Sequence, residues 1–162
     1  MNPYFPAINL YSAPRYERSP CVTGTTQLAV NSNGKIRVFP VLTIFGMVLR
    51  QSVAVASYNT LLSVTEFAQV TSCRLRTTSY DLVRIVDAEG YSLECSPAHR
   101  VWAENRQTYV TAASLDISDL LRHSDGSLGH DPVVESIERG AIYELVVQDN
   151  HNFYANGVLV HE

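Results

Sequence analysis

Short apolar segments separated by polar turns run through most of the chain. The segments are rich in Val, Ile, Thr and Tyr, and turn pairs such as Asn33-Gly34 and Glu89-Gly90 divide them, a pattern typical of strands and hairpins. The pattern predicts strands over Gln27–Val30, Lys35–Phe39, Ser52–Tyr58, Asp81–Val86, Tyr91–Cys95, Arg100–Ala103, Gln107–Thr111, Pro132–Ile137, Ala141–Val147, Asn152–Tyr154 and Val158–His161. So many strands favour a closed or strongly coiled all-β fold, because open strand edges would template aggregation.

Two segments depart from the strand pattern. Ser114–Leu121 carries apolar residues behind a serine suited to capping a helix, so it is the one helix that the sequence predicts. Arg122–Asp131 is polar and glycine-containing, which predicts an exposed loop. We expect His123 and His130, which belong to this loop, to be solvated.

The first twenty residues differ from the rest. They contain four prolines and several tyrosines without a sustained period, which predicts an extended arm, residues 1–20, ahead of one compact domain, residues 21–162. The chain has 12 Lys and Arg against 16 Asp and Glu and no basic run, which argues against nucleic-acid binding.

Membrane insertion and secretion are also unexpected. The longest apolar stretch, Val38–Leu49, contains Pro40 and falls short of the roughly 20 residues that a spanning helix needs. The start of the chain lacks the features of a signal peptide. We therefore expect a cytoplasmic protein.

The cysteines argue against a disulfide framework and against a thiolate zinc site. Cys21, Cys73 and Cys95 are odd in number and form no CxxC pair. Cys73 and Cys95 are expected to be buried and inert. Trp102 is expected to fill the core. For Cys21 the alternatives of a buried residue and a reactive thiol stay open until its neighbours are considered.

Four motifs carry candidate chemistry, and their order along the chain is informative. They are Cys21-Val22-Thr23-Gly24, Cys95-Ser96-Pro97-Ala98-His99, His151-Asn152-Phe153-Tyr154-Ala155-Asn156-Gly157 and Val158-Leu159-Val160-His161-Glu162. In this order they resemble the conserved blocks of inteins, the protein-splicing members of the Hint family. The resemblance covers residues 21–162 and implies a horseshoe-like Hint fold of coiled antiparallel sheets with little helix. It also implies a mini-intein, because the homing-endonuclease insert of larger members would fall near Arg122–Asp131.

The resemblance implies an autocatalytic first step at the Pro20–Cys21 bond. Cys21 would attack the carbonyl of Pro20 to form a thioester, an intramolecular reaction with a low entropy cost. Ser96 and His99 match the family's Thr-x-x-His motif with serine in place of threonine. His99 would then act as the acid–base group and Ser96 as a hydrogen-bond donor.

The C-terminal residues depart from the family pattern. His151 and His161 match the helper histidines, but Glu162 stands where the family has the asparagine that cyclises. A carboxylate is a weak nucleophile and its extra methylene requires a six-membered ring, so we expect no cyclisation. With the chain ending at Glu162, full splicing is not expected either.

Two further departures concern the first half of the reaction. Pro20 precedes the nucleophile and its ring restricts the geometry at the scissile carbonyl, and Thr25 stands where the family often has aspartate. We expect a slow first step.

The resemblance implies no cofactor and no metal. The expected partners are the chain's own flanking extein segments, with residues 1–20 as a short stub of the upstream extein. The domain is expected to be a monomer that turns over once. Two alternatives stay open: a Cys–His thiol hydrolase acting on other chains, and a catalytically silent β-rich interaction module in which Cys21 is buried and unreactive.

Overall fold

The computed structural model describes residues 21–162, apart from the side chains of residues 77–80. The expected arm over residues 1–20, including Pro20, lies outside the described residues. The elements in chain order are β2 (Val22–Thr23), β3 (Gln27–Ser32), β4 (Lys35–Pro40), α2 (Val41–Met47), β5 (Ala54–Asn59), β6 (Val64–Val86), β7 (Ser92–Cys95), β8 (Arg100–Ala103), β9 (Thr108–Thr111), the 3₁₀ turn η1 (Ala112–Ser114), β10 (Leu121–Arg122), β11 (Leu128–Gly129), β12 (Val133–Val147), β13 (Asn152–Ala155) and β14 (Val158–His161).

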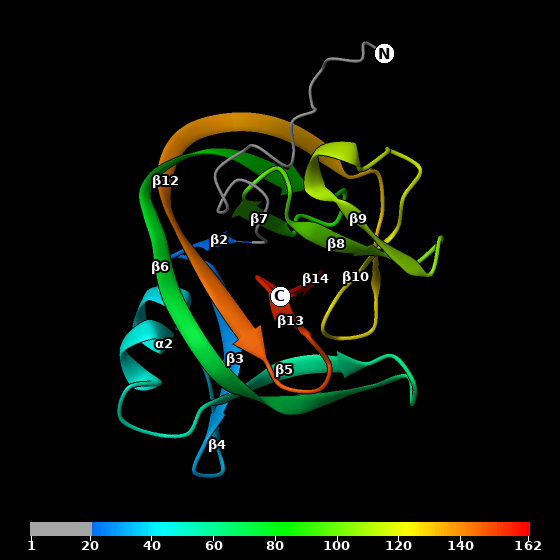
Figure 1. Cartoon of the computed structure of the whole chain (residues 1–162). Coiled ribbons are helices and arrows are strands. Elements are labelled where there is room, and N and C mark those ends of the chain that lie inside the picture. Colours follow the sequence, from blue (N-terminus) through cyan, green and yellow to red (C-terminus); the bar gives the residue numbers. More distant parts are fainter. Residues whose placement is uncertain (1–20) are drawn as a thin grey trace.

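The strands form two antiparallel sheets over residues 21–162. One has the order β12-β2-β7-β6-β5-β3-β4, and the other has β11-β10-β8-β14-β13, with β9 pairing β8. The long strands β6 and β12 run side by side in an arch, and the C-terminus lies between the sheets (Figure 1). The prediction of an all-β fold with coiled antiparallel sheets is confirmed.

Bulges allow β6 and β12 to bend. Their register shifts at four places, three of them between Ile137 and Tyr143 around Gly140, and an extra residue on one strand of a pair increases its local twist and bend. The sequence predicted β12 as two strands and predicted only the last part of β6. In the structure, β12 is one continuous curved strand, and β6 begins well before the predicted part.

The core takes residues from both sheets and from α2. Its largest cluster includes Leu28, Ile85, Leu93, Leu145 and Phe153, all at most 1% exposed. Successive side chains of a strand point to opposite faces. Strand β3 buries mainly the face that carries Leu28 and Val30, whereas β13 is buried on both faces. A smaller cluster contains Trp102, as expected.

The predicted helix over Ser114–Leu121 is wrong. After η1 the chain forms turns, because the buried carboxylate of Asp119 accepts the main-chain N–H of Asp116 at 2.8 Å and two bonds from the Arg106 guanidinium at 2.7 and 2.8 Å. Such side-chain bonds to the backbone compete with helical ones. Leu121 then joins β10, paired with Ala103.

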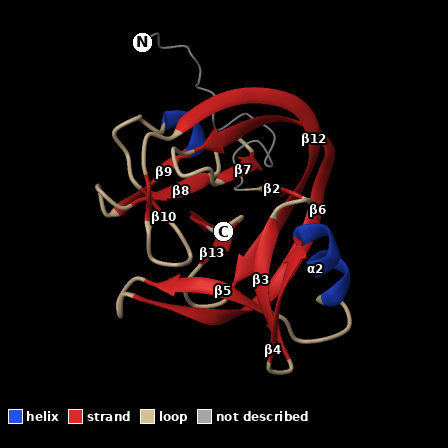
Figure 2. Cartoon of the chain, turned by 180° about the vertical axis from the view of Figure 1, so that it is seen from behind, coloured by secondary structure: helices blue, strands red, loops and turns tan. Residues whose placement is uncertain are grey.

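The one α-helix in the described part of the chain is α2, which the sequence did not predict. It follows Pro40, whose extended backbone occupies the N-cap position. The first two helical N–H groups, of Val41 and Leu42, donate to the main-chain oxygens of Thr26 and Gly24 at 2.8 and 2.9 Å. The helix covers the outer side of the first sheet (Figure 2). Neither α2 nor any other helix found in residues 21–162 has the length and apolar character needed to cross a membrane.

Candidate functional site

The pairing of β2 with β7 places Ser96 opposite Cys21. Val22 lies in register with Cys95, and the Ser96 N–H donates to the Cys21 carbonyl oxygen at 3.0 Å. In return, the Cys21 N–H points to the Ser96 Oγ at 3.4 Å. Both residues are fully buried. The nitrogen of the bond between residues 20 and 21 therefore has the Ser96 hydroxyl beside it.

His99 is brought to the same place by a tight turn. Its N–H donates to the Ser96 carbonyl at 3.0 Å, and its ring Nδ1 lies 3.2 Å from the Cys21 carbonyl oxygen. Because a carbonyl only accepts, Nδ1 carries the proton when this bond is made. The ring packs edge-on against Phe153. The predicted residues Cys21, Ser96 and His99 thus form one cluster.

Burial keeps the His99 ring neutral. The side chain is fully buried, which lowers the pKa of His99 from 6.5 to about 3, against the opposing effect of the hydrogen bond to Cys21. Desolvation disfavours the charged form of a base. At neutral pH His99 can hold the Cys21 carbonyl, but it carries no charge.

The Cys21 thiol is also held in its neutral form. Burial, and then the nearby Glu144 carboxylate, raise the pKa of Cys21 to about 12, while Arg76 acts in the opposite direction. Arg76 and Glu144 pair with each other at 3.6 Å. Local sequence patterns contain no signal for these two residues, because they act on the thiol from β6 and β12, which are distant from Cys21 in the chain.

The other two cysteines are buried, as expected, and none of the three forms a disulfide. Burial raises the pKa of Cys73 to about 12 and also raises that of Cys95. Within residues 21–162, no three His, Cys, Asp or Glu side chains are grouped so that they could hold a metal ion.

A second cluster surrounds the Glu162 carboxylate. The Val147 N–H donates to Oε2 at 2.6 Å, and the His151 Nδ1 lies 3.0 Å from Oε1. The Glu162 N–H donates to the His151 carbonyl at 2.9 Å. Only 16% of the Glu162 side chain is exposed, against 58% of that of His151. Glu162 is therefore anchored by its carboxylate, and the sequence could not show this because the Val147 donor is main chain.

His161 has two competing partners on one ring nitrogen. Its Nδ1 lies 2.9 Å from the Glu162 main-chain oxygen and 3.3 Å from an Arg100 guanidinium nitrogen. A carbonyl oxygen only accepts and a guanidinium only donates, so a neutral ring satisfies one of them at a time. Burial, as the main cause, lowers the pKa of His161, which favours this neutral ring.

The two clusters meet through β8 and β14. Val160 of β14 lies in register with Val101 of β8, and Arg100 at the start of β8 contacts His161. The neighbouring residue His99 feels His161 electrostatically. Arg100 was not among the residues predicted from the sequence, although its position next to His99 was a possible signal.

A cavity of about 640 Å³ borders the first cluster. Leu82 and Ile137 line it and also pack in the small cluster that contains Cys21. Thr25, at which the sequence departs from the family pattern, lies on its wall. The cavity therefore lies beside the residues that pack around Cys21.

No protein-family model and no curated protein matches the chain. Solved structures do match. The DnaB intein from Synechocystis sp. PCC 6803 superimposes with a TM-score of 0.73 at 17% identity, over 87% of this chain and 96% of that one. The chain has the Hint fold of inteins. An intein from a hyperthermophile gives 0.74 at 15% identity, over 88% and 99% of the two chains. The transcription factor IIB Mvu mini-intein gives 0.71 at 16%, over 89% and 100%.

Proposed function

We propose that this chain is a self-processing domain of the intein type, in which Cys21 attacks the carbonyl carbon of Pro20. The observation that carries the proposal is the contact of the Cys21 nitrogen with the Ser96 hydroxyl, in a fold shared with inteins. The substrate is the chain's own flanking segment. The domain acts as a monomer, and each molecule reacts once because the bond it cleaves, Pro20–Cys21, is part of its own chain.

The proposed step exchanges an amide for a thioester. The bond from the Cys21 Sγ to the Pro20 carbonyl carbon forms and the bond from that carbon to the Cys21 nitrogen breaks. The proton that the thiol loses ends on the leaving Cys21 nitrogen; we assign its transfer to His99 as the acid–base group, while the Ser96 hydroxyl beside that nitrogen serves as a hydrogen-bonding group. The neutral His99 ring keeps the Cys21 carbonyl in place through its Nδ1–H, which holds the nucleophile in a fixed geometry.

The protonation state of the thiol makes this step slow. Burial raises the pKa of Cys21 to about 12, so the thiol is held protonated at pH 7, and the thiolate is the better nucleophile. The Pro20 ring adds a steric restriction at the scissile carbonyl. We therefore propose that the upstream segment is released slowly.

The C-terminal half is proposed to be unable to cyclise. The Glu162 carboxylate offers no amide nitrogen, and Val147 and His151 hold both of its oxygens. His161 still contacts the Glu162 main-chain oxygen, a contact that would polarise a following peptide bond.

The silent interaction module is the second candidate. The full burial of Cys21 and the high pKa of its thiol favour it, because it requires an unreactive cysteine. The same burial argues against a thiol hydrolase, since an added substrate would have no access to the sulfur.

The test is incubation of the chain at neutral pH with dithiothreitol, followed by intact mass spectrometry, with Cys21→Ala as the control. Release of residues 1–20 from the unaltered chain alone supports the proposal. The same incubation of Pro20→Gly separates a first step slowed by proline from an absent activity. A Pro20→Gly chain that stays intact would leave the silent module as the function.

A further inference from the structure

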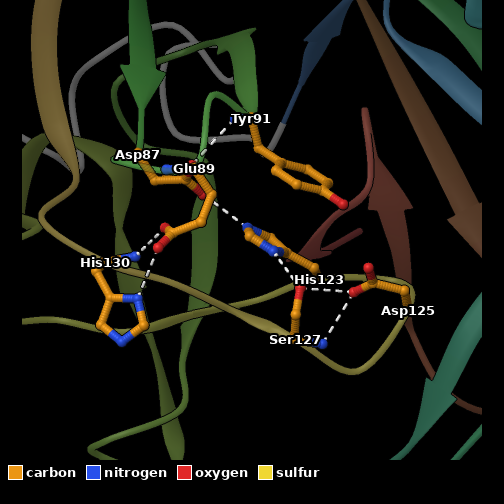
Figure 3. Close-up of polar contacts among 7 residues, drawn as sticks. All are labelled: Asp87, Glu89, Tyr91, His123, Asp125, Ser127 and His130. Atoms are coloured by element: carbon orange, nitrogen blue, oxygen red, sulfur yellow. Dashed lines mark hydrogen bonds and ion pairs between the residues drawn. The ribbon is translucent and has the colours of Figure 1, made fainter.

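A third polar cluster lies away from Cys21 and centres on His123. The expectation that His123 is solvated is wrong, because its side chain is fully buried. The ring Nε2 lies 2.6 Å from the Asp87 Oδ2, and both side chains are fully buried. The ring Nδ1 lies 2.8 Å from the Ser127 Oγ, which in turn lies 2.6 Å from the Asp125 Oδ1 (Figure 3). The Asp87 carboxylate, 36 residues earlier in the chain, supplies the hydrogen-bond partner that lets the polar His123 ring be buried.

The contacts of this cluster require one proton more than its neutral groups supply. Each of the three short contacts needs one hydrogen between its two heavy atoms. A neutral imidazole brings one, the Ser127 hydroxyl brings one, and the carboxylates of Asp87 and Asp125 bring none. With two hydrogens, two lone pairs would face each other at one of the contacts. A third hydrogen removes that conflict.

The extra proton belongs on His123. The other oxygen of Asp87, Oδ1, accepts the main-chain N–H groups of Glu89 and Tyr91, both at 3.0 Å, and such donors stabilise a carboxylate in its charged form. The Tyr91 ring stacks on the His123 ring with centroids 3.6 Å apart. The face of an aromatic ring attracts a cation.

The charged groups around His123 agree with a cationic ring. Asp87 and Asp125 face it directly or through Ser127. His123 also helps to lower the pKa of Asp125, after the stronger effect of the Ser127 hydrogen bonds. Glu89 and His130, which also lie nearby, are more exposed and pair with each other. The His130 Nδ1 lies 2.9 Å from the Glu89 Oε2.

The order Asp87, His123, Ser127 resembles a catalytic triad, but the hydrogen bonds oppose that reading. In a triad the histidine accepts the serine proton. Here the Ser127 hydroxyl donates to the Asp125 Oδ1 at 2.6 Å. Both ring nitrogens of His123 already have partners, so neither is free to act as a base. The exposed Ser127 is therefore an acceptor for the ring and not a nucleophile.

The cluster joins segments that lead to both halves of the candidate site. Asp87 lies in the turn before β7, which leads to Ser96. His123 lies at the end of β10 and forms a bridge with Val158, the first residue of β14. The N–H of Ser124 donates to the Gly157 carbonyl at 2.9 Å. The cluster thus fixes β14 relative to the turn before β7.

We propose that His123 holds a proton on both ring nitrogens in the folded chain, and that this charged ring locks the β10–β11 hairpin and the start of β14 to the turn before β7. With a single ring proton the contact between His123 and Asp87 is no longer charge-assisted, and the lock is weaker. The lock depends only on the Hint fold and not on the proposed reaction.

The test is nuclear magnetic resonance of the full chain labelled with ¹⁵N-histidine at pH 7, with His123 assigned by comparison with His123→Gln. The unaltered chain is expected to show protons on both His123 ring nitrogens. Asp125→Ala is expected to lose one of them, because the Ser127 hydroxyl is then free to donate to Nδ1. Asp81→Ala removes an exposed carboxylate that pairs with Arg139, and this control is expected to retain both.

Hydrogen exchange provides the second readout. Exchange of the Ser124 amide is expected to rise in Asp125→Ala and to stay unchanged in Asp81→Ala. A single ring proton on His123 in the unaltered chain, or two in Asp125→Ala, would overturn the proposal. Labelling of Ser127 by a fluorophosphonate would also overturn it, in favour of the triad.

Discussion

The buried, neutral His99 predicts how the stability of the fold depends on pH. The pKa of His99 is lowered from 6.5 to about 3 in the folded chain, so the unfolded chain binds more protons between these two values. The free energy of unfolding therefore falls as the pH falls through this window. Between pH 7 and pH 5 the loss from His99 alone is about 2 kcal/mol. A folded pKa of 4 instead of 3 would change this figure little, because pH 5 lies above both.

The assay is urea unfolding of the unaltered chain and of His99→Asn at pH 7 and pH 5. Asparagine keeps an N–H donor near the position of Nδ1, and the other ionisable groups are common to both chains. The unaltered chain is expected to lose about 2 kcal/mol more than the variant on acidification. If both chains lose the same unfolding free energy between pH 7 and pH 5, the reasoning is refuted. His99 would then bind its proton as readily in the folded chain as in the unfolded chain.

Two further changes test contacts in the structure. Gly129→Ala places a methyl group against Asp87 and 2.7 Å from the His123 Nε2, so we expect a loss of roughly 1–3 kcal/mol in urea unfolding; Gly46→Ala, which meets open space, is the control and is expected to be neutral or stabilising. Glu162→Asn in a chain extended beyond residue 162 is expected to release the added segment, as seen by mass spectrometry, whereas Glu162→Gln is expected not to; release from both would contradict the ring-size argument.

The sequence predicted the residues that local spacing brings together. The two residues between Ser96 and His99 form a turn whose main-chain bond, at 3.0 Å, returns the histidine to the strand end. The alternation of polar and apolar residues likewise predicted most strands. Cys21 and Ser96 meet because adjacent strands pair antiparallel, a contact that only the family resemblance suggested.

Contacts between distant residues were not predictable from local patterns. His123 looked solvated because its sequence neighbours are polar, whereas Asp87 is supplied by another segment. The predicted helix near Asp119 was replaced by side-chain bonds from Arg106. The real helix was missed because Pro40 interrupts an apolar run, and its place at the N-cap shows that the proline marked a helix start.

The central claim is that the carbonyl of Pro20 moves onto the sulfur of Cys21. Hydroxylamine cleaves thioesters rapidly and ordinary amides very slowly, so it captures the acyl group as a hydroxamate. Treatment of the unaltered, Pro20→Gly and Cys21→Ala chains, followed by mass spectrometry, is expected to give the hydroxamate of residues 1–20 from the first two and fastest from Pro20→Gly. Equal yields from the Cys21→Ala chain, or no hydroxamate from Pro20→Gly, would contradict the account.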